Sequence, residues 1–233
     1  MQITFQLGTT YLTIFIAAVI SYLSLRILLN LRKLKDNSVE NFILIFCSGA
    51  IFYALGEVSF FFTSNYSYIS VADIFFVIGS VLFIVAFSYK YLELEKKSLS
   101  FKEIFAFNSC ILVSALILFF LFHKFAFPEI GKIPFIEIFL NFFYPITSVI
   151  IFLFALANRI HSNEKGGYSF YIMSSFFFLF IGDMLYSYTS WTNTYGIIGR
   201  AHDLVYILGY LFMLFGVLLF YKKLKNSTGK SGK

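Results

Sequence analysis

Charged residues are scarce in this chain. Asp, Glu, Lys and Arg make up 13% of its 233 residues, whereas 59% are hydrophobic and 22% aromatic. A water-soluble domain of ordinary composition is about 25% charged, so the composition excludes one. The segments between the apolar runs are short, and none of them is long enough for an extramembrane catalytic domain. We therefore expect an all-α integral membrane protein, multi-pass in the cell membrane, surrounded by the lipid bilayer.

Histidine and cysteine are also few, with three and two residues. His123 and His202 fall on one predicted side of the membrane and His161 on the other, which excludes an intramembrane zinc site. Cys47 and Cys110 lack metal-ligand spacing, and no histidine is within reach along their helices. We therefore expect no enzymatic activity, no metal and no cofactor.

Every lysine lies at the end of an apolar run or in a loop, which excludes a retinal Schiff base in the middle of a helix. No glycine-rich phosphate loop is present. The net charge of +6 is carried by loops and by the C-terminal segment. This distribution indicates membrane orientation and not nucleic-acid binding.

Apolar runs long enough to cross a hydrocarbon core of about 30 Å are present seven times. They predict transmembrane helices near 9–31, 41–63, 70–92, 103–122, 134–157, 168–190 and 201–221. Residues 1–222 would form this seven-helix domain and residues 223–233 a basic cytoplasmic tail. Pro145 falls inside the fifth run, where its missing amide donor predicts a kink that serves either a moving helix or a static bend.

The loops give the orientation. All but three of the 18 basic residues lie on one predicted face, the exceptions being Lys124, Lys132 and Arg200. The positive-inside rule makes that face cytoplasmic and places the N-terminus outside. No basic region precedes the first apolar run, so we expect a retained first helix and not a cleaved signal peptide.

The third and seventh runs resemble each other. Without gaps, D-I-F-F-V-I-G aligns with D-L-V-Y-I-L-G, and further back Gly56-Glu57 aligns with Gly182-Asp183 after a four-residue insertion. One interpretation is a duplication with a 3+1+3 plan, in which the halves are related by an axis along the membrane normal. The other is that apolar helices resemble each other by composition alone.

Two acids lie inside apolar runs, Glu57 in the second and Asp183 in the sixth. An ionisable group in a membrane-spanning segment costs a few kcal/mol, so it indicates function by default. Three- and four-residue spacing puts Tyr53 on the face of Glu57, and Ser187 on that of Asp183 with Tyr186 beside it. We expect both faces to point into the bundle and to line an acidic pocket open to the outside.

Two further acids, Asp73 and Asp203, lie near predicted helix starts. They belong either to the pocket or to helix caps. The pocket would have Arg200, His202 and Trp191 at its rim. It would hold a cation or a small polar ligand, or act as a proton-linked switch; alternatively, its hydrogen bonds only lock the helices together. The candidate ligand-binding residues are Glu57, Asp183, Tyr53, Tyr186, Ser187, Asp73, Asp203, Arg200 and His202.

Residues 182–216 contain G-D-M-L-Y at a helix end, T-Y-G in a turn and D-L-V-Y-I-L-G-Y at a helix start. This stretch resembles prokaryotic multi-helix membrane sensory modules found N-terminal to diguanylate cyclase, phosphodiesterase or histidine kinase domains. The resemblance implies sensing and signalling, with Asp183, Tyr186, Asp203, Gly209 and Tyr210 as signature positions. Since the sequence shows no output domain before its end, it also implies a separate cytoplasmic signalling partner.

Two alternatives to a receptor-like sensor remain open. One is a structural subunit that docks against another membrane protein through its phenylalanine-rich surface. The other is a small-solute or cation transporter with the 3+1+3 plan of SWEET-type sugar carriers. Few polar residues, among them Ser148, fall on the predicted cytoplasmic halves of the helices, which argues against transport.

Overall fold

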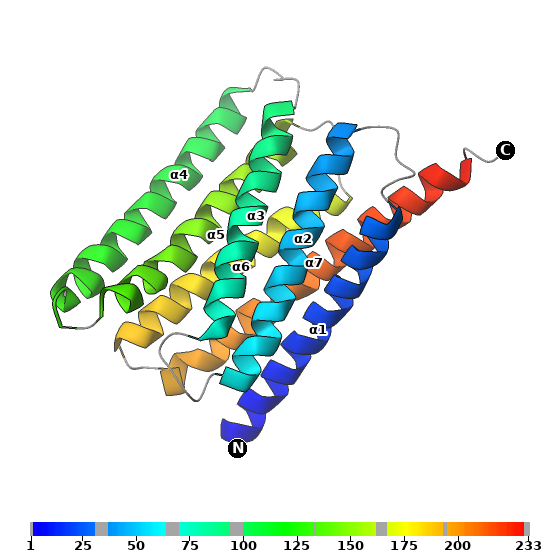
Figure 1. Ribbon diagram of the computed structural model, residues 1–233. Helices are drawn as coiled ribbons and strands as arrows, with labels where there is room; N and C mark the ends of the chain where they lie inside the picture. The colour runs from blue at the N-terminus through cyan, green and yellow to red at the C-terminus, as the bar shows by residue number, and fades with distance from the viewer. Residues whose placement is uncertain are drawn as a thin grey trace.

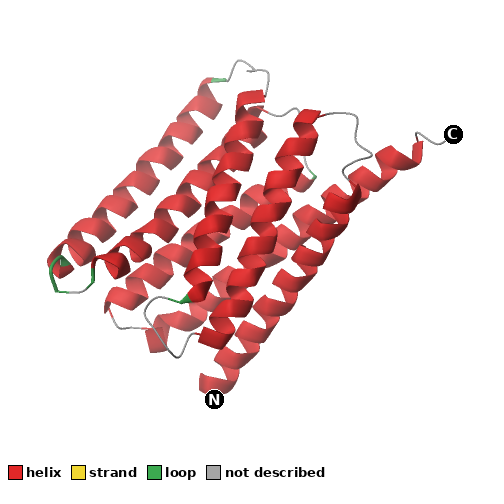
Figure 2. Ribbon diagram, in the orientation of Figure 1, coloured by secondary structure: helices red, strands yellow, loops and turns green. Residues whose placement is uncertain are grey.

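The computed structural model describes residues 2–30, 37–63, 70–93, 100–132, 134–161, 167–192 and 195–230. Within these ranges every element is a helix, as Figure 2 shows. The helices are α1 (Gln2–Asn30), α2 (Asn37–Thr63), α3 (Val71–Glu93), α4 (Phe101–Leu121), α5 (Phe135–His161), α6 (Tyr168–Thr192) and α7 (Tyr195–Lys230), with two short helical segments, Phe122–Ala126 and Phe127–Glu129, after α4.

Seven helices in the described part of the chain are long and apolar enough to cross a membrane. This confirms the predicted all-α class and the predicted number of spans. The helices lie roughly alongside one another in Figure 1. We call the end where α1 begins the N-terminal end of the bundle. There α3, α5 and α7 also begin, and α2 and α6 end.

Six of the helices form a closed ring. Going round it, α1 packs on α2, α2 on α3, α3 on α5, α5 on α6, α6 on α7, and α7 on α1. Helix α4 lies outside the ring against α5, at one edge of the bundle in Figure 1. Its large apolar side chains are largely exposed, among them Phe105, Leu112 and Phe119. Such a surface suits a helix whose surroundings are hydrocarbon.

Aromatic side chains fill the interior of the six-helix ring. The ring centroid of Phe83 on α3 lies 4.9 Å from that of Phe176 on α6 and 5.2 Å from that of Phe46 on α2. Phe87 lies 5.5 Å from Phe176, edge to face. Aromatic pairs in these geometries contribute about 0.5–1.5 kcal/mol beyond their buried area. The core therefore joins α2, α3 and α6.

Glycines bring α2 close to α3 and α6 close to α7. A Cβ added at Gly79 would lie 2.4 Å from the Tyr53 ring, and one at Gly209 would lie 3.0 Å from Leu179. Small residues at helix crossings allow this close approach in membrane proteins. Likewise, a Cβ at Gly56 would lie 2.6 Å from Phe76, and one at Gly182 would lie 3.1 Å from Tyr206.

Helix α7 begins at Tyr195, six residues before the predicted start at 201. The predicted polar turn around Gly196 is therefore largely helix, because glycine in an apolar stretch does not by itself end a membrane-spanning helix. Asp203 consequently lies more than two turns inside α7, and the interpretation of Asp203 as a helix cap is wrong. At its other end α7 continues to Lys230, so most of the basic segment 223–233 extends this helix.

Candidate functional site

Asp183 lies on the inner side of α6 and accepts two hydroxyl hydrogen bonds. Ser148 of α5 donates to Oδ2, and Tyr206 of α7 donates to Oδ1. The carboxylate therefore links three helices. It does not lie against lipid, because both of its oxygens are used within the bundle.

Glu57 on α2 is bonded across the bundle in the same way. The Tyr210 hydroxyl of α7 donates to its Oε1 over 2.5 Å. Tyr53, one turn earlier on α2, is buried and shares a 2.9 Å hydrogen bond with the Ser80 hydroxyl of α3. Glu57 thus connects α2 to α7, and Tyr53 connects α2 to α3.

Asp73 has two roles. Its Oδ2 accepts hydrogen bonds from the backbone amide of Ser70, at 2.7 Å, and from the Ser70 hydroxyl, at 3.2 Å. This is the arrangement of a cap at a helix start, which confirms that interpretation for Asp73. Its Oδ1 accepts a 2.5 Å hydrogen bond from the Tyr144 hydroxyl of α5. The cap of α3 therefore also links α3 to α5.

Asp203 links α7 to α1. The Thr9 hydroxyl of α1 donates to its Oδ2 over 3.4 Å. Its Oδ1 lies 3.1 Å from Nδ1 of the adjacent His202, which is charged only when protonated. His202 is 6% exposed and lies between the rings of Tyr186 and Tyr206, with centroids 5.5 and 4.8 Å away. His202 is therefore part of the interior, and its predicted place at a pocket rim is wrong.

These groups form one set, which we call the acid layer. It consists of four carboxylates and five hydroxyl donors in the half of the bundle nearer its N-terminal end. Each of the six ring helices contributes at least one member. The members are Thr9, Glu57, Asp73, Tyr144, Ser148, Asp183, Asp203, Tyr206 and Tyr210.

Ser187 of α6 donates a hydrogen bond to the backbone of α5. Pro145 has no amide hydrogen to donate to the carbonyl of Asn141, four residues earlier. The Ser187 hydroxyl of α6 donates to that carbonyl over 2.8 Å. Because Ser187 is 1% exposed, a buried acceptor freed by the proline is satisfied by the neighbouring helix. The structure thus gives the predicted ligand-binding residue Ser187 a structural partner.

Two of the remaining predicted residues, Trp191 and Tyr186, pack against aromatic or histidine rings. Trp191 packs against Phe142 of α5, with ring centroids 5.1 Å apart. Tyr186 lies beside His202, as described above. The side chain of Arg200 lies outside the described part of the chain, so its prediction is not addressed by these contacts.

The sequence pattern predicts the four acids but not most of their partners. It places Ser148 in the opposite half of the helices, yet the Ser148 hydroxyl donates to Asp183. A usable signal was present, because Tyr206 follows Asp203 by three residues and Tyr210 follows Tyr206 by four. Tyr144 and Ser148 are likewise four residues apart on α5. Thr9 had no such signal, since its partner Asp203 is 194 residues away in the chain.

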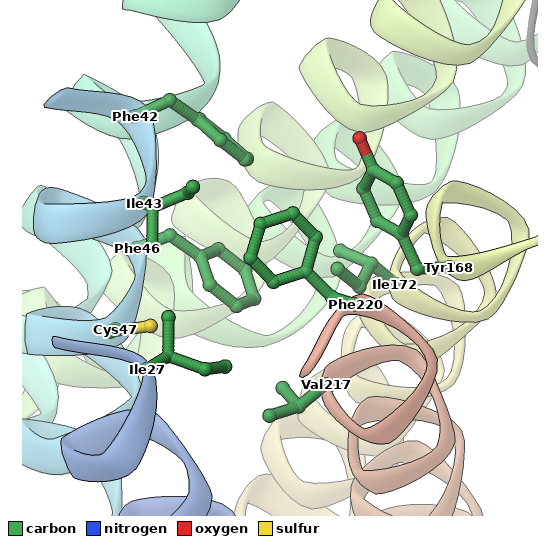
Figure 3. Close-up of a pocket in the computed structure, with 9 residues that line it drawn as sticks. All are labelled: Ile27, Phe42, Ile43, Phe46, Cys47, Tyr168, Ile172, Val217 and Phe220. Carbon is green, nitrogen blue, oxygen red and sulfur yellow. The ribbon is translucent and has the colours of Figure 1, made fainter. Parts of the chain in front are cut away.

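Two pockets in the described part of the chain lie toward the opposite end of the bundle. One is drawn in Figure 3, where the rings of Phe42, Phe46, Phe220 and Tyr168 lie between α2 and the pair α6 and α7. Neither pocket is lined by an acid. The acidic hollow open to the outside therefore stays a prediction. Within the described ranges, no three His, Cys, Asp or Glu side chains are grouped closely enough to hold a metal ion.

Comparisons with protein-family models, with curated proteins and with solved structures give no match for this chain.

Proposed function

We propose that this protein is a membrane-embedded sensor and that the acid layer is its sensing site. The observation that carries the proposal is that the acids bond across helix boundaries: Glu57 to α7, Asp73 to α5, and Asp203 to α1. A change in charge at these carboxylates alters contacts between helices, and not only within one. A signal received there reaches the packing of the whole ring.

The signal that fits such a layer best is a proton. An ionised carboxylate only accepts hydrogen bonds, whereas a protonated one carries a donor as well. Asp183 accepts from Ser148 and Tyr206 at once, so the donor that protonation adds needs an acceptor of its own, and either hydroxyl becomes one when it turns its hydrogen away. This step needs no preformed cavity, in keeping with a layer whose acids are already engaged by hydroxyl groups.

The titratable groups that face the layer come from every ring helix except α1, which contributes Thr9. Among the described residues they are Tyr53 and Glu57 on α2, Asp73 on α3, Glu137 and Tyr144 on α5, Asp183 and Tyr186 on α6, and His202, Asp203, Tyr206 and Tyr210 on α7. A titration of this site is therefore a property of the coupled set and not of one acid.

The proposal includes the 3+1+3 plan, with α1–α3 and α5–α7 as halves and α4 as the link. Equivalent contacts support it: Phe76 faces Gly56 as Tyr206 faces Gly182, and Tyr53 faces Gly79 as Leu179 faces Gly209. The hydrogen bonds of Asp73 and Asp203 also occupy corresponding places in the two halves. Asp73 of α3 bonds the first helix of the other half, α5, and Asp203 of α7 bonds α1. Because the basic loops lie at the end of the bundle opposite the acid layer, the positive-inside rule would place the acid layer on the outer side of the membrane.

Trp191 offers a direct test, because it is the only tryptophan in the chain and lies two turns from Asp183 on α6. We expect its fluorescence in the purified protein to change in a sigmoidal manner between about pH 4 and about pH 9, the range over which buried carboxyl groups titrate. The Glu57→Gln/Asp183→Asn variant should lose that transition while keeping its helical content. Glu93→Gln, which removes an exposed carboxyl at the opposite end, should keep it.

His202 needs its own control, because its ring lies between those of Tyr186 and Tyr206 and its Nδ1 lies 3.1 Å from Asp203 Oδ1. His202→Gln removes one member of the coupled set, so it should shift the midpoint of the transition without abolishing it. A wild-type fluorescence that is flat with pH, together with a destabilised double variant, would mean that the acids only lock the helices. That result would favour a structural subunit.

The paired halves also favour a second candidate, a cation transporter that rocks its halves about the acid layer. Proteoliposomes with an entrapped pH indicator distinguish the two functions. Under an imposed sodium gradient, a sodium–proton exchanger would change the internal pH, and the Glu57→Gln/Asp183→Asn variant would not. A sensor would leave the internal pH unchanged in both.

A further inference from the structure

Helix α4 has two different faces. The face toward α5 carries its two buried side chains, Ser114 and Leu121. On the opposite face, exposed residues recur at alternating spacings of four and three along the helix. We call this row the α4 seam. Its members are Phe101, Phe105, Asn108, Leu112, Ala115 and Phe119.

The spacing of the α4 seam is that of a helix that packs on a second helix. Alternating spacings of three and four average 3.5 residues, the repeat that keeps one row of side chains facing a partner helix. Helix α5 is not that partner, because it lies on the other side of α4, and α4 forms an edge of the bundle in Figure 1. The four large apolar residues of the seam are 61–81% exposed. The seam is therefore open to a neighbour outside the chain.

Asn108 is the one member of the seam that does not suit hydrocarbon. Its side chain is exposed, and among the described residues its amide has no hydrogen-bond partner. It lies seven residues after Phe101, about 10 Å along α4 and thus within a hydrocarbon core about 30 Å thick. No water is present at that depth to satisfy the amide. Unlike lysine or arginine, asparagine is too short to reach the headgroups.

A second copy of the chain supplies the missing partner. Two copies inserted in the same orientation can be related by a twofold axis along the membrane normal, and each residue near that axis then faces its own counterpart. An asparagine amide has both donors and an acceptor, so it is complementary to itself. Two turns beyond Asn108, Ala115 has a side chain small enough to allow the two helices to approach closely.

We propose that this protein forms a parallel dimer through the α4 seam, in which the two Asn108 side chains hydrogen-bond to each other. The amide pair also fixes the register, because a shift along the helices would place each amide against an apolar side chain. Lipid alone would cover the apolar members of the seam but would leave both amides unsatisfied. Since α4 lies outside the six-helix ring, the dimer leaves each ring intact and does not depend on the acid layer.

The first test measures self-association in phosphatidylcholine liposomes. Fluorescence energy transfer between donor-labelled and acceptor-labelled copies is followed as the protein is diluted with lipid. We expect the transfer to exceed that of randomly placed monomers and to fall along a monomer–dimer curve. Transfer no greater than the random value would mean that lipid covers the seam, and it would overturn the proposal.

The second test changes the amide. Asn108→Leu should weaken the dimer by about 3- to 30-fold, the effect of losing hydrogen bonds between membrane helices. Asn108→Gln keeps an amide and should weaken it less. Val113→Leu, at an exposed position off the seam, should leave it unchanged. An undiminished dimer in Asn108→Leu, equal losses in the leucine and glutamine variants, or an equal loss in Val113→Leu would overturn the proposal.

The third test maps the contact in native membranes and leaves Asn108 in place. In a chain with Cys47 and Cys110 replaced by alanine, single cysteines are introduced in the seam, at Leu112 or Ala115, and at two exposed positions off the seam, Val113 or Ile117. We expect an oxidant to join two copies through the seam cysteines only. Equal crosslinking at both sets of positions, or seam cysteines joined only to a different protein, would overturn the proposal.

Discussion

At the scale of single residues, the strongest claim concerns hydroxyl groups that donate to buried carboxylates. Tyr206 donates to Asp183, and removing its hydroxyl leaves Oδ1 without that donor. We expect Tyr206→Phe to lower the free energy of unfolding by about 1.5–3 kcal/mol, the range for hydrogen bonds to charged groups. Tyr22→Phe, which changes an exposed tyrosine, should cost less than about 0.5 kcal/mol. Reversible unfolding in detergent measures both; equal effects would contradict the assignment.

Gly79 tests the close packing of α2 on α3. Its added methyl group would lie 2.4 Å from the Tyr53 ring and 3.2 Å from the carbonyl oxygen of Gly49. We expect Gly79→Ala to destabilise the protein by about 1–3 kcal/mol through overpacking. Gly8→Ala has nothing within 4 Å and should leave stability unchanged or slightly raised. A neutral Gly79→Ala would mean that α2 and α3 are farther apart than described.

At this scale the sequence predicted which residues were unusual but not what they touch. Glu57 and Asp183 stand out because a charge is rare among apolar neighbours. Their partners Tyr210 and Ser148 are common residue types in membrane helices, so composition does not distinguish them from others. Contacts between residues distant in the chain depend on how the helices are rotated in the bundle. Single-sequence periodicity does not supply that rotation for helices that are apolar on all sides.

At the scale of elements, α5 and α6 are joined where α5 contains Pro145. The carbonyl of Asn141 receives the Ser187 hydroxyl in place of a backbone amide. We expect Ser187→Ala to cost about 1–3 kcal/mol in the wild-type background, because it leaves a buried acceptor unsatisfied. In a Pro145→Ala background the restored amide can bond that carbonyl, so the same change should cost about 1 kcal/mol less.

This double-mutant cycle isolates the coupling between the two residues. Additive effects of Pro145→Ala and Ser187→Ala would contradict the exchange of donors. The sequence predicted the position of the proline inside the fifth helix correctly. It could not predict that α6 would supply the missing donor.

Helix boundaries, too, are only partly predictable from the sequence. The core of every predicted span is helical, because long apolar runs leave the backbone no partner but itself. Helix α7 starts earlier than the sequence pattern predicts, because Gly196 and the polar residues near it are typical of a turn but lie in or beside the first turns of the helix. That error matters because it made Asp203 a candidate cap, whereas the structure has it bonded to α1.

At the scale of the whole molecule, the proposed orientation rests on the basic loops alone and is open to direct measurement. In a background without Cys47 and Cys110, single cysteines are introduced at two exposed lysines, Lys132→Cys near the N-terminal end and Lys102→Cys at the opposite end. We expect a membrane-impermeant maleimide to label the first in intact cells and the second only after permeabilisation. The reverse pattern would place the acid layer on the cytoplasmic side.

The central claim is that a change in charge at the acid layer moves the opposite ends of the helices. Spin labels at Glu93→Cys on α3 and Lys222→Cys on α7, both exposed, report on the third helix of each proposed half. Double electron–electron resonance between about pH 4 and about pH 9 should show their distance change by about 1–2 Å or more, the scale of helix shifts in switching proteins. The change should be absent when Glu57→Gln and Asp183→Asn are added. An unchanged wild-type distance, or a change that persists in that variant, would contradict the account.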